Sequence, residues 1–190
     1  MANESRVRKS AKNMASGMAY RFLTIITAFI VRTVFIKCLN NVYLSVNGLY
    51  SSILSMLSLA ELGFSTAMVY SMYKPLADGD NKKLSQIMHL YKRVYRYIGL
   101  FILIVGLCLV PFLDIFIKNK PDISNLTFYY ILFLVDAVLS YWFFAYRTSI
   151  LQADQKAYII SNYSSIFNLI KAVLQIAGLL WFHNFTLYLL

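Results

Sequence analysis

Long apolar runs separated by short polar breaks dominate the pattern of residues along this chain. A helix that crosses the hydrocarbon core of a bilayer needs about 20 mostly apolar residues, because each residue advances it by about 1.5 Å. Five runs meet this requirement and predict membrane-spanning helices at residues 14–36, 43–72, 97–117, 126–146 and 157–182. A further apolar run at residues 185–190 is too short to cross, so we expect a fragment that stops early in a sixth helix.

The polar breaks have the composition of turns and interfaces. The break at residues 74–83 combines one proline and one glycine with several charges, which is typical of a turn between helices. Residues 84–96 have apolar positions at helical spacing and predict an interfacial helix that leads into the third span. Residues 1–13 form a basic tail that we expect in the cytoplasm, and residues 14–190 are predicted to form one transmembrane helical lobe.

The composition favours a membrane protein over a soluble domain. Hydrophobic residues make up 59% of the 190 residues and charged residues only 14%, whereas a typical soluble domain has about 25% charged residues. The sequence therefore predicts an all-α integral membrane protein with about five full transmembrane helices. It contains no nucleotide-binding loop, hydrolase motif or metal-ligand spacing, so we expect no enzymatic activity, no catalytic residues, no metal and no cofactor.

Positive charge is unevenly distributed along the chain, whose net charge is +10. Basic residues beside membrane spans are concentrated on the cytoplasmic side. With a cytoplasmic amino terminus, 13 of the 18 Lys and Arg residues fall on that side: Arg6, Arg8, Lys9, Lys12, Arg21, Lys74, Lys82, Lys83, Lys92, Arg93, Arg96, Arg147 and Lys156. Only Lys37, Lys118 and Lys120 fall outside. The placement of the charges beside the spans thus indicates membrane lipids as partners. We expect no nucleic-acid partner, because the sequence has no stripe of basic residues interleaved with aromatic residues.

Polar side chains inside the predicted spans recur at helical spacing. Arg21 and Arg32 in the first span are 11 residues apart, about three turns, and so share one face. The stripes of the later spans contain Glu61, Asp136 and Lys171 among serine, asparagine and glutamine residues. Charged side chains inside a membrane are costly and usually mark a pathway or a relay.

Two interpretations of these stripes stay open. In the first, small hydroxyl residues allow close helix packing, and acids pair with bases between helices, for example Arg32 with Glu61. In the second, the stripes converge on one solvated cavity that passes a polar substrate. The second interpretation makes Arg21, Arg32, Glu61, Asp136 and Lys171 candidate residues of the substrate pathway.

Three segments carry a family resemblance: residues 29–36 (FIVRTVFI), 43–63 (YLSVNGLYSSILSMLSLAELG) and 67–77 (AMVYSMYKPLA). They closely resemble the amino-terminal region of bacterial polysaccharide flippases, which are Wzx-like transporters of the multidrug/oligosaccharidyl-lipid/polysaccharide exporter superfamily. The resemblance extends more loosely to the end of the chain. It implies one lobe of a two-lobe exporter fold in a bacterial plasma membrane, with undecaprenyl-diphosphate-linked oligosaccharide passing through a central cavity.

The resemblance implies cavity-lining or gating positions for Arg32 and Glu61, whereas Asp136 and Lys171 rest on the polar stripes alone. Arginine and lysine supply charge-assisted hydrogen bonds to phosphate, and an acid such as Glu61 or Asp136 is expected to take a coupling H⁺ or Na⁺. Two alternatives stay open. One is a drug or metabolite exporter of the same superfamily, for which an acidic, aromatic cavity is expected. The other is a truncated or scaffolding membrane fragment that transports nothing.

Overall fold

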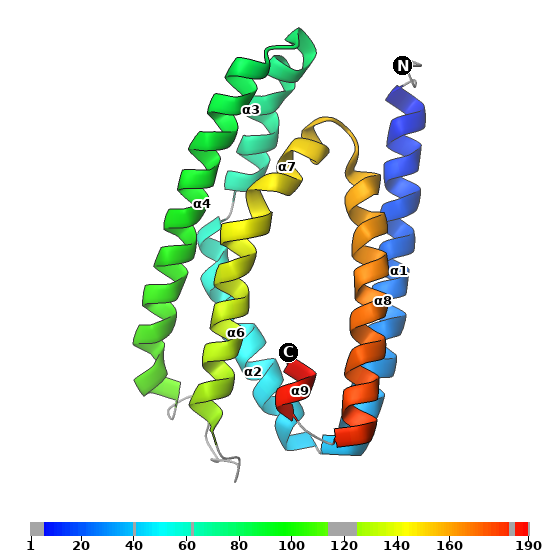
Figure 1. Ribbon diagram of the computed structural model, residues 1–190, viewed down its shortest axis with the longest axis vertical. Helices are drawn as coiled ribbons and strands as arrows, with labels where there is room; N and C mark the ends of the chain where they lie inside the picture. The colour runs from blue at the N-terminus through cyan, green and yellow to red at the C-terminus, as the bar shows by residue number, and fades with distance from the viewer. Residues whose placement is uncertain (1–5, 40, 62, 114–124, 183–184, 190) are drawn as a thin grey trace.

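The computed structural model of the chain describes residues 6–39, 41–61, 63–113, 125–182 and 185–189 (Figure 1). In chain order its elements are α1 (Arg6–Leu39), α2 (Asn41–Ser58), η1 (Leu59–Glu61), α3 (Phe64–Asp78), α4 (Asn81–Leu109), η2 (Val110–Phe112), α6 (Leu126–Ser140), η3 (Tyr141–Ala145), α7 (Tyr146–Ala153), α8 (Ala157–Phe182) and α9 (Phe185–Leu189). The expected all-α class is confirmed for these residues. The first five residues of the tail, the predicted end of the third span at residue 117, and both Lys118 and Lys120 lie outside the described residues.

The turn between α3 and α4 explains why the polar break there ends one helix and begins another. Gly79 has a φ of 69°, a left-handed conformation that glycine adopts at little steric cost, and it caps α3. The Asp80 side chain then accepts a 2.9 Å hydrogen bond from the backbone N–H of Lys83 and caps the start of α4. A long helical hairpin results (Figure 1).

The second predicted span does not form one continuous helix. α2 ends at Ser58, the 3₁₀ turn η1 follows, and α3 begins at Phe64. Gly63 lies at this break with a φ of 88°, which other residues rarely adopt. The predicted count of five spans is therefore not supported, because the break leaves two shorter helices. Four helical segments are long and apolar enough to cross a membrane: Arg8–Leu39, Asn81–Phe112, Leu126–Ala153 and Ala157–Phe182.

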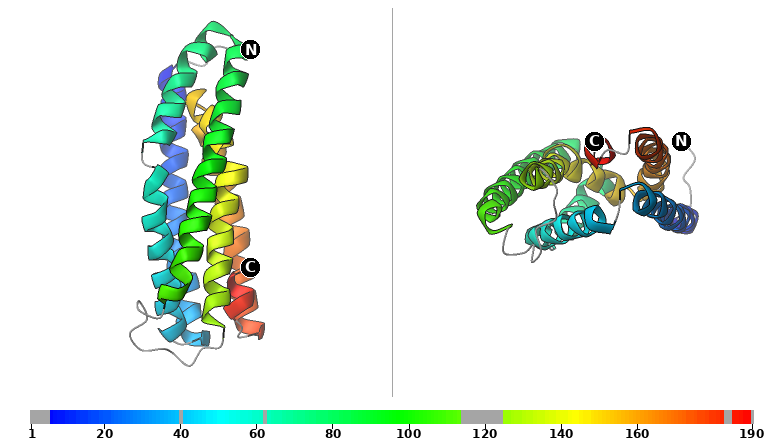
Figure 2. Two further views of the ribbon diagram at one scale, coloured as in Figure 1. Left: turned by 90° about the vertical axis from the view of Figure 1, so that its left-hand side faces the viewer. Right: turned by 90° about the horizontal axis from the view of Figure 1, so that it is seen from below.

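The helices form two groups that meet at both ends of the molecule (Figures 1 and 2). α1 packs along most of α8, and these two helices make the smaller group. α2, α3, α4, α6 and α7 make the larger group, in which α4 packs against α3, α6 and α7. The chain passes between the groups at the α1–α2 connection at one end and at the α7–α8 turn at the other. The short α9 lies at the first of these ends, against α8 and α6.

Two buried glycines let α4 approach α6 and the following turn η3 closely. A Cβ atom at Gly106 would lie 2.4 Å from Cδ1 of Leu134, and one at Gly99 would lie 2.5 Å from Nε1 of Trp142. Small residues at such contacts are typical of helix packing in membranes. The Tyr130 hydroxyl also donates a 3.0 Å hydrogen bond to the Gly106 carbonyl. This bond satisfies the only polar group of a tyrosine that is otherwise fully buried between the helices.

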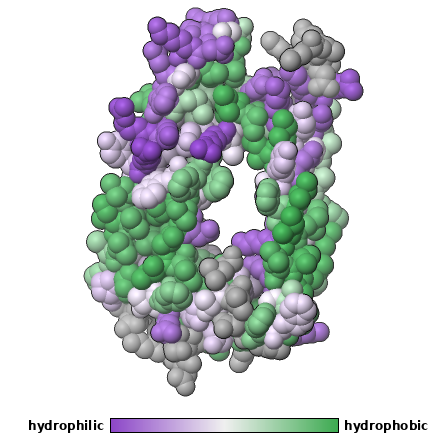
Figure 3. All heavy atoms as spheres, viewed as in Figure 1, coloured by the Kyte–Doolittle hydropathy of each residue, from purple (hydrophilic) through white to green (hydrophobic). Residues whose placement is uncertain are grey.

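Large apolar side chains cover the outside of the molecule. Only 11% to 22% of the apolar window of each long helix is buried inside the protein. The exposed residues include Phe22, Phe29, Phe101, Ile104, Phe167 and Leu174. Figure 3 shows hydrophobic surface across the middle of both groups, with hydrophilic residues gathered at the end that carries the α3–α4 turn. An apolar exterior of this extent is favourable in hydrocarbon and unfavourable in water.

Candidate functional site: a polar cavity between the helix groups

A polar cavity lies between the two groups of helices, and Figure 3 shows its opening with hydrophilic residues at the edge. It has chambers of about 400, 130 and 350 Å³, which we call the first, second and third chamber. The first two are lined by both groups, and the third by helices of the larger group alone. The first and second chambers share wall residues Asn47, Lys171, Gln175 and Tyr188. Asp136 lines both the second and the third. The shared residues make the three chambers parts of one polar region.

Two cations lie in the first chamber. Arg32 on α1 and Lys171 on α8 both line it. No carboxylate in the described part of the chain forms an ion pair with either side chain. The Thr27 hydroxyl lies 2.8 Å from Oδ1 of Asn168 and joins α1 to α8 beside these cations. The N–H donors of Arg32 and Lys171 are therefore available to an anion that enters the chamber.

The second chamber places an acid opposite a cation. Asp136 on α6 and Lys171 on α8 line it together, from different helix groups, without forming an ion pair. Gln175 donates a 3.1 Å hydrogen bond from Nε2 to the carbonyl of Tyr188. This bond ties α8 to α9 at the wall of the chamber. Within the described residues, the amide oxygen of Gln175 accepts no hydrogen bond and can accept one from a polar ligand.

Glu61 and Asp136 are the acids of the third chamber, and a tyrosine hydrogen-bonds to Glu61. The Tyr95 hydroxyl donates a 2.7 Å hydrogen bond to Oε1 of Glu61. Tyr141 in the π-helical turn η3 lines the same chamber, and its ring stacks on that of Tyr95 with 6.3 Å between centroids. Glu61 is thus held by a neutral hydroxyl group. Neutralising it by a proton or a bound cation breaks no ion pair within the described residues.

The structure places four of the five candidate residues on the walls of this cavity. Arg32, Glu61, Asp136 and Lys171 all line one chamber or more. Arg21 lies exposed on α1, outside the walls of the three chambers. The ion pair between Arg32 and Glu61 that the packing interpretation suggested is not formed, since the two residues line different chambers.

Reasoning from the sequence missed Tyr95, the hydrogen-bond partner of Glu61, and Tyr141, which lines the same chamber as Glu61. Tyr95 precedes the predicted third span, and Tyr141 lies in the aromatic run YWFFA, so neither is distinctive in the sequence. The available signal is general: a buried tyrosine hydroxyl needs a hydrogen-bond partner. Asn47 and Gln175 belong to the polar stripes, but nothing in the spacing singles them out from their neighbours.

The chemistry of the cavity is suited to binding. Its cations lie in the first chamber and its acids in the second and third, with amide side chains between them. Arginine and lysine bind phosphate or carboxylate groups through charge-assisted hydrogen bonds. Within the described ranges, no three His, Cys, Asp or Glu side chains lie close enough together to hold a metal ion.

The helices and their apolar exterior define a multi-pass α-helical membrane protein with a polar cavity between its helix groups. Comparisons with protein-family models, with curated proteins and with solved structures found no match to this chain.

Proposed function

We propose that this chain is the amino-terminal lobe of a transporter that moves a lipid-linked oligosaccharide across a bacterial plasma membrane. The observation that carries the proposal is the first chamber, where Arg32 and Lys171 lie without ion-pair partners among the described residues. Both residues lie on helices that are long and apolar enough to span a membrane. The resemblance of residues 29–77 to Wzx-like flippases supplies the substrate class.

The cavity suits a substrate with a charged head and an apolar tail. A diphosphate in hydrocarbon carries a prohibitive desolvation cost unless it is paired and hydrogen-bonded. Arg32 and Lys171 offer that pairing, and the amides of Asn47, Asn168 and Gln175 offer hydrogen bonds to sugar hydroxyls. The opening between the two helix groups lets a polyprenyl tail stay in the bilayer while the head occupies the cavity (Figure 3).

In this proposal the amino terminus lies in the cytoplasm. The end of the molecule that carries the α3–α4 turn is hydrophilic, as the positive-inside rule expects of a cytoplasmic face (Figure 3). α2, η1 and α3 together then cross the membrane as a broken fifth span. Irregular backbone at membrane depth is tolerated where it lines a cavity, and Glu61 at this break lines the third chamber.

Glu61 is the proposed site at which a coupling H⁺ or Na⁺ binds. Among the described residues its carboxylate accepts a hydrogen bond from one hydroxyl group and forms no ion pair, so it can change charge without losing a cationic partner. Glu61→Gln in the complete transporter is expected to uncouple flipping from the ion gradient. If both the flipping rate and its ion dependence stay unchanged in that variant, Glu61 is not the coupling residue.

The binding step can be tested with the chain itself. We expect purified protein in detergent to bind a short-chain polyprenyl diphosphate. Arg32→Gln and Lys171→Gln should each weaken binding by about tenfold or more, because each removes a charge-assisted hydrogen bond worth about 1.5–3 kcal/mol. The matched control is Arg21→Gln, which removes the same charge from the same helix outside the cavity. Equal losses in Arg21→Gln and Arg32→Gln would contradict the proposed site.

A second candidate function is drug export, and the third chamber favours it. Glu61 and Asp136 line this chamber together with the ring of Tyr141, and acids beside an aromatic ring are a common setting for organic cations. Tetraphenylphosphonium binding that is lost in Glu61→Gln, together with no affinity for polyprenyl diphosphate, would favour the drug exporter.

A further inference from the structure

A second group of cations lies away from the central cavity, where α4 meets the start of α7. Lys92 and Arg96 are four residues apart on α4 and therefore share one helix face. Arg147 lies in the first turn of α7. Tyr91 and Tyr95, beside these two residues on α4, pack in one cluster with Tyr146, so all three cations lie where α4 meets α7 although Arg96 and Arg147 are 51 positions apart in the chain.

The guanidinium group of Arg147 is held in one orientation. Its Nε donates a 3.1 Å hydrogen bond to the Tyr146 hydroxyl, and its Cζ lies 5.6 Å from the centre of the same ring. Tyr146 is itself buried, so it makes a fixed support. The terminal nitrogens of Arg147 remain as donors for a ligand. A cationic side chain held in place in this way loses little conformational entropy when it binds a ligand.

The two helices that carry the cations are fixed to each other at the same level. Nε1 of Trp142 donates a 3.3 Å hydrogen bond to the carbonyl of Arg96. The indole also packs where Gly99 has no side chain. Trp142 belongs to the π-helical turn η3 that precedes α7, and π-helical turns frequently occur at functional sites. The distance between Arg96 and Arg147 is therefore set by packed structure.

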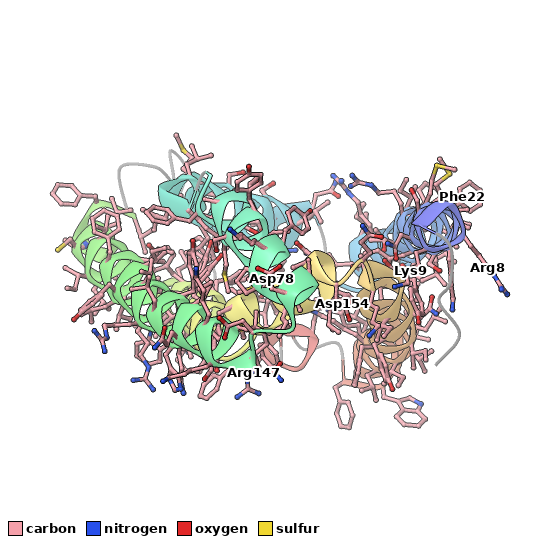
Figure 4. All side chains as sticks on the ribbon, turned by 90° about the horizontal axis from the view of Figure 1, so that it is seen from above. Arg8, Lys9, Phe22, Asp78, Arg147 and Asp154 are labelled. Atoms are coloured by element: carbon pink, nitrogen blue, oxygen red, sulfur yellow. The ribbon has the colours of Figure 1, made fainter. Side chains whose placement is uncertain are left out.

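The cations lie at the border between apolar and polar surface. Tyr97 and Phe144 are one turn or less away on the apolar side, and their side chains are 66% and 64% exposed. Exposed aromatic rings beside basic residues are typical of headgroup depth in a bilayer. Figure 4 shows Arg147 on the outer side of the larger helix group, with further nitrogen-tipped side chains along that side. Among the described residues, no carboxylate forms an ion pair with Lys92, Arg96 or Arg147.

We propose that Lys92, Arg96 and Arg147 form a binding site for the phosphate group of an anionic membrane lipid. The lipid tails lie along the exposed aromatic and aliphatic surface below the cations, and the phosphate accepts hydrogen bonds from the three side chains. The site shares no residue with the central cavity and does not depend on transport.

The test is native mass spectrometry of the purified chain in equal amounts of phosphatidylglycerol and phosphatidylcholine. The wild-type chain is expected to retain phosphatidylglycerol preferentially. The triple variant Lys92→Gln, Arg96→Gln and Arg147→Gln should lose about tenfold or more of that preference. The triple control Lys74→Gln, Lys82→Gln and Lys83→Gln removes the same charge from exposed positions at the same end and should lose about twofold at most.

Four further measurements decide the outcome. Charge-preserving exchange of the same residues (Lys92→Arg, Arg96→Lys and Arg147→Lys) should retain most of the preference, and circular dichroism should show equal helix content in all variants. Tyr146→Phe, which removes the support of Arg147, should give an intermediate loss. Equal losses in the two triple Gln variants, or no lipid preference in the wild type, would overturn the proposal. Competition by inorganic diphosphate at the same concentration as the lipid would also overturn it, by assigning the site to free phosphate.

Failure of the proposed lipid site can be distinguished from failure of the proposed transport function. The triple Gln variant at Lys92, Arg96 and Arg147 leaves Arg32 and Lys171 intact, so its binding of polyprenyl diphosphate in the central cavity should stay within about twofold of the wild type.

Discussion

The Tyr95 hydroxyl donates a 2.7 Å hydrogen bond to Glu61, across 34 residues of chain. Glu61 ends the 3₁₀ turn at which α2 breaks off, and Tyr95 is buried on α4. The bond therefore attaches the break between α2 and α3 to the longest helix of the larger group. It also keeps the Glu61 carboxylate at the wall of the third chamber.

Removing this hydrogen bond should destabilise the protein. Tyr95→Phe keeps the ring and leaves one Glu61 oxygen without its donor, and we expect a loss of about 1 kcal/mol. That loss corresponds to a decrease in Tm of about 2–4 °C for a chain of this size. The control Tyr97→Phe removes a hydroxyl from an exposed ring of the same helix and should leave Tm unchanged. Equal Tm values for the two variants, measured by thermal unfolding in detergent, would contradict this role.

The close contact of α4 with α6 predicts opposite effects at two glycines. Gly106→Ala places a Cβ against the fully buried Leu134, which has no room to move away, and should destabilise the protein by about 1–3 kcal/mol. Gly17→Ala in α1 meets no atom within 4 Å and should be neutral or stabilise the helix by about 0.5–1 kcal/mol. Thermal unfolding of both variants under one condition checks the difference in sign.

Shortening Leu134 should remove the clash that Gly106→Ala creates, which provides a second check on the same contact. In the double variant Gly106→Ala and Leu134→Ala, the added methyl group occupies part of the space that Leu134 leaves. The double variant should therefore lose less stability than the sum of the two single losses. Additive losses would show that the two side chains do not share this space.

Asn13 ties the start of α1 to the turn before α8. Its Nδ2 donates a 2.8 Å hydrogen bond to the carbonyl of Gln155, and its Oδ1 accepts one of 2.8 Å from the backbone N–H of Tyr158. Asn13→Ala removes both bonds. We expect the amides in the first turn of α8 to exchange hydrogen about tenfold faster, because the turn opens more easily. Asn162→Ala, at an exposed position on α8, is the control and should leave that exchange unchanged.

The proposed orientation predicts which surface residues a membrane-impermeant thiol reagent reaches in intact cells. On a background without Cys38 and Cys108, Lys37→Cys near the end of α1 should be labelled from outside. Asp78→Cys, at the opposite end beside the α3–α4 turn, should be labelled only after the cells are opened. The reverse pattern would place the amino terminus outside and contradict the orientation.

The helices at the long apolar runs could be predicted because a membrane span needs a minimum length of apolar residues, a requirement that can be counted in the sequence. The break at Gly63 was harder to predict. A single glycine inside an apolar helix is often tolerated, and only the backbone shows that Gly63 adopts a left-handed conformation with a 3₁₀ turn before it. The second predicted span therefore differs most from the structure.

Helical periodicity in the sequence was enough to identify the polar face of each helix, since residues three or four apart must share a face. It could not show which faces meet. The cavity brings together Arg32, Asp136 and Lys171 from three helices, and their distances depend on how α1 and α8 diverge from the larger group. The hydrogen bond from Tyr95 to Glu61 depends in the same way on helix packing. The local sequence pattern thus defined the helices, their polar faces and the asymmetry of charge along the chain. Contacts between distant residues were decided by the tertiary fold, because the spacing of residues along one helix carries no information about the neighbouring helices.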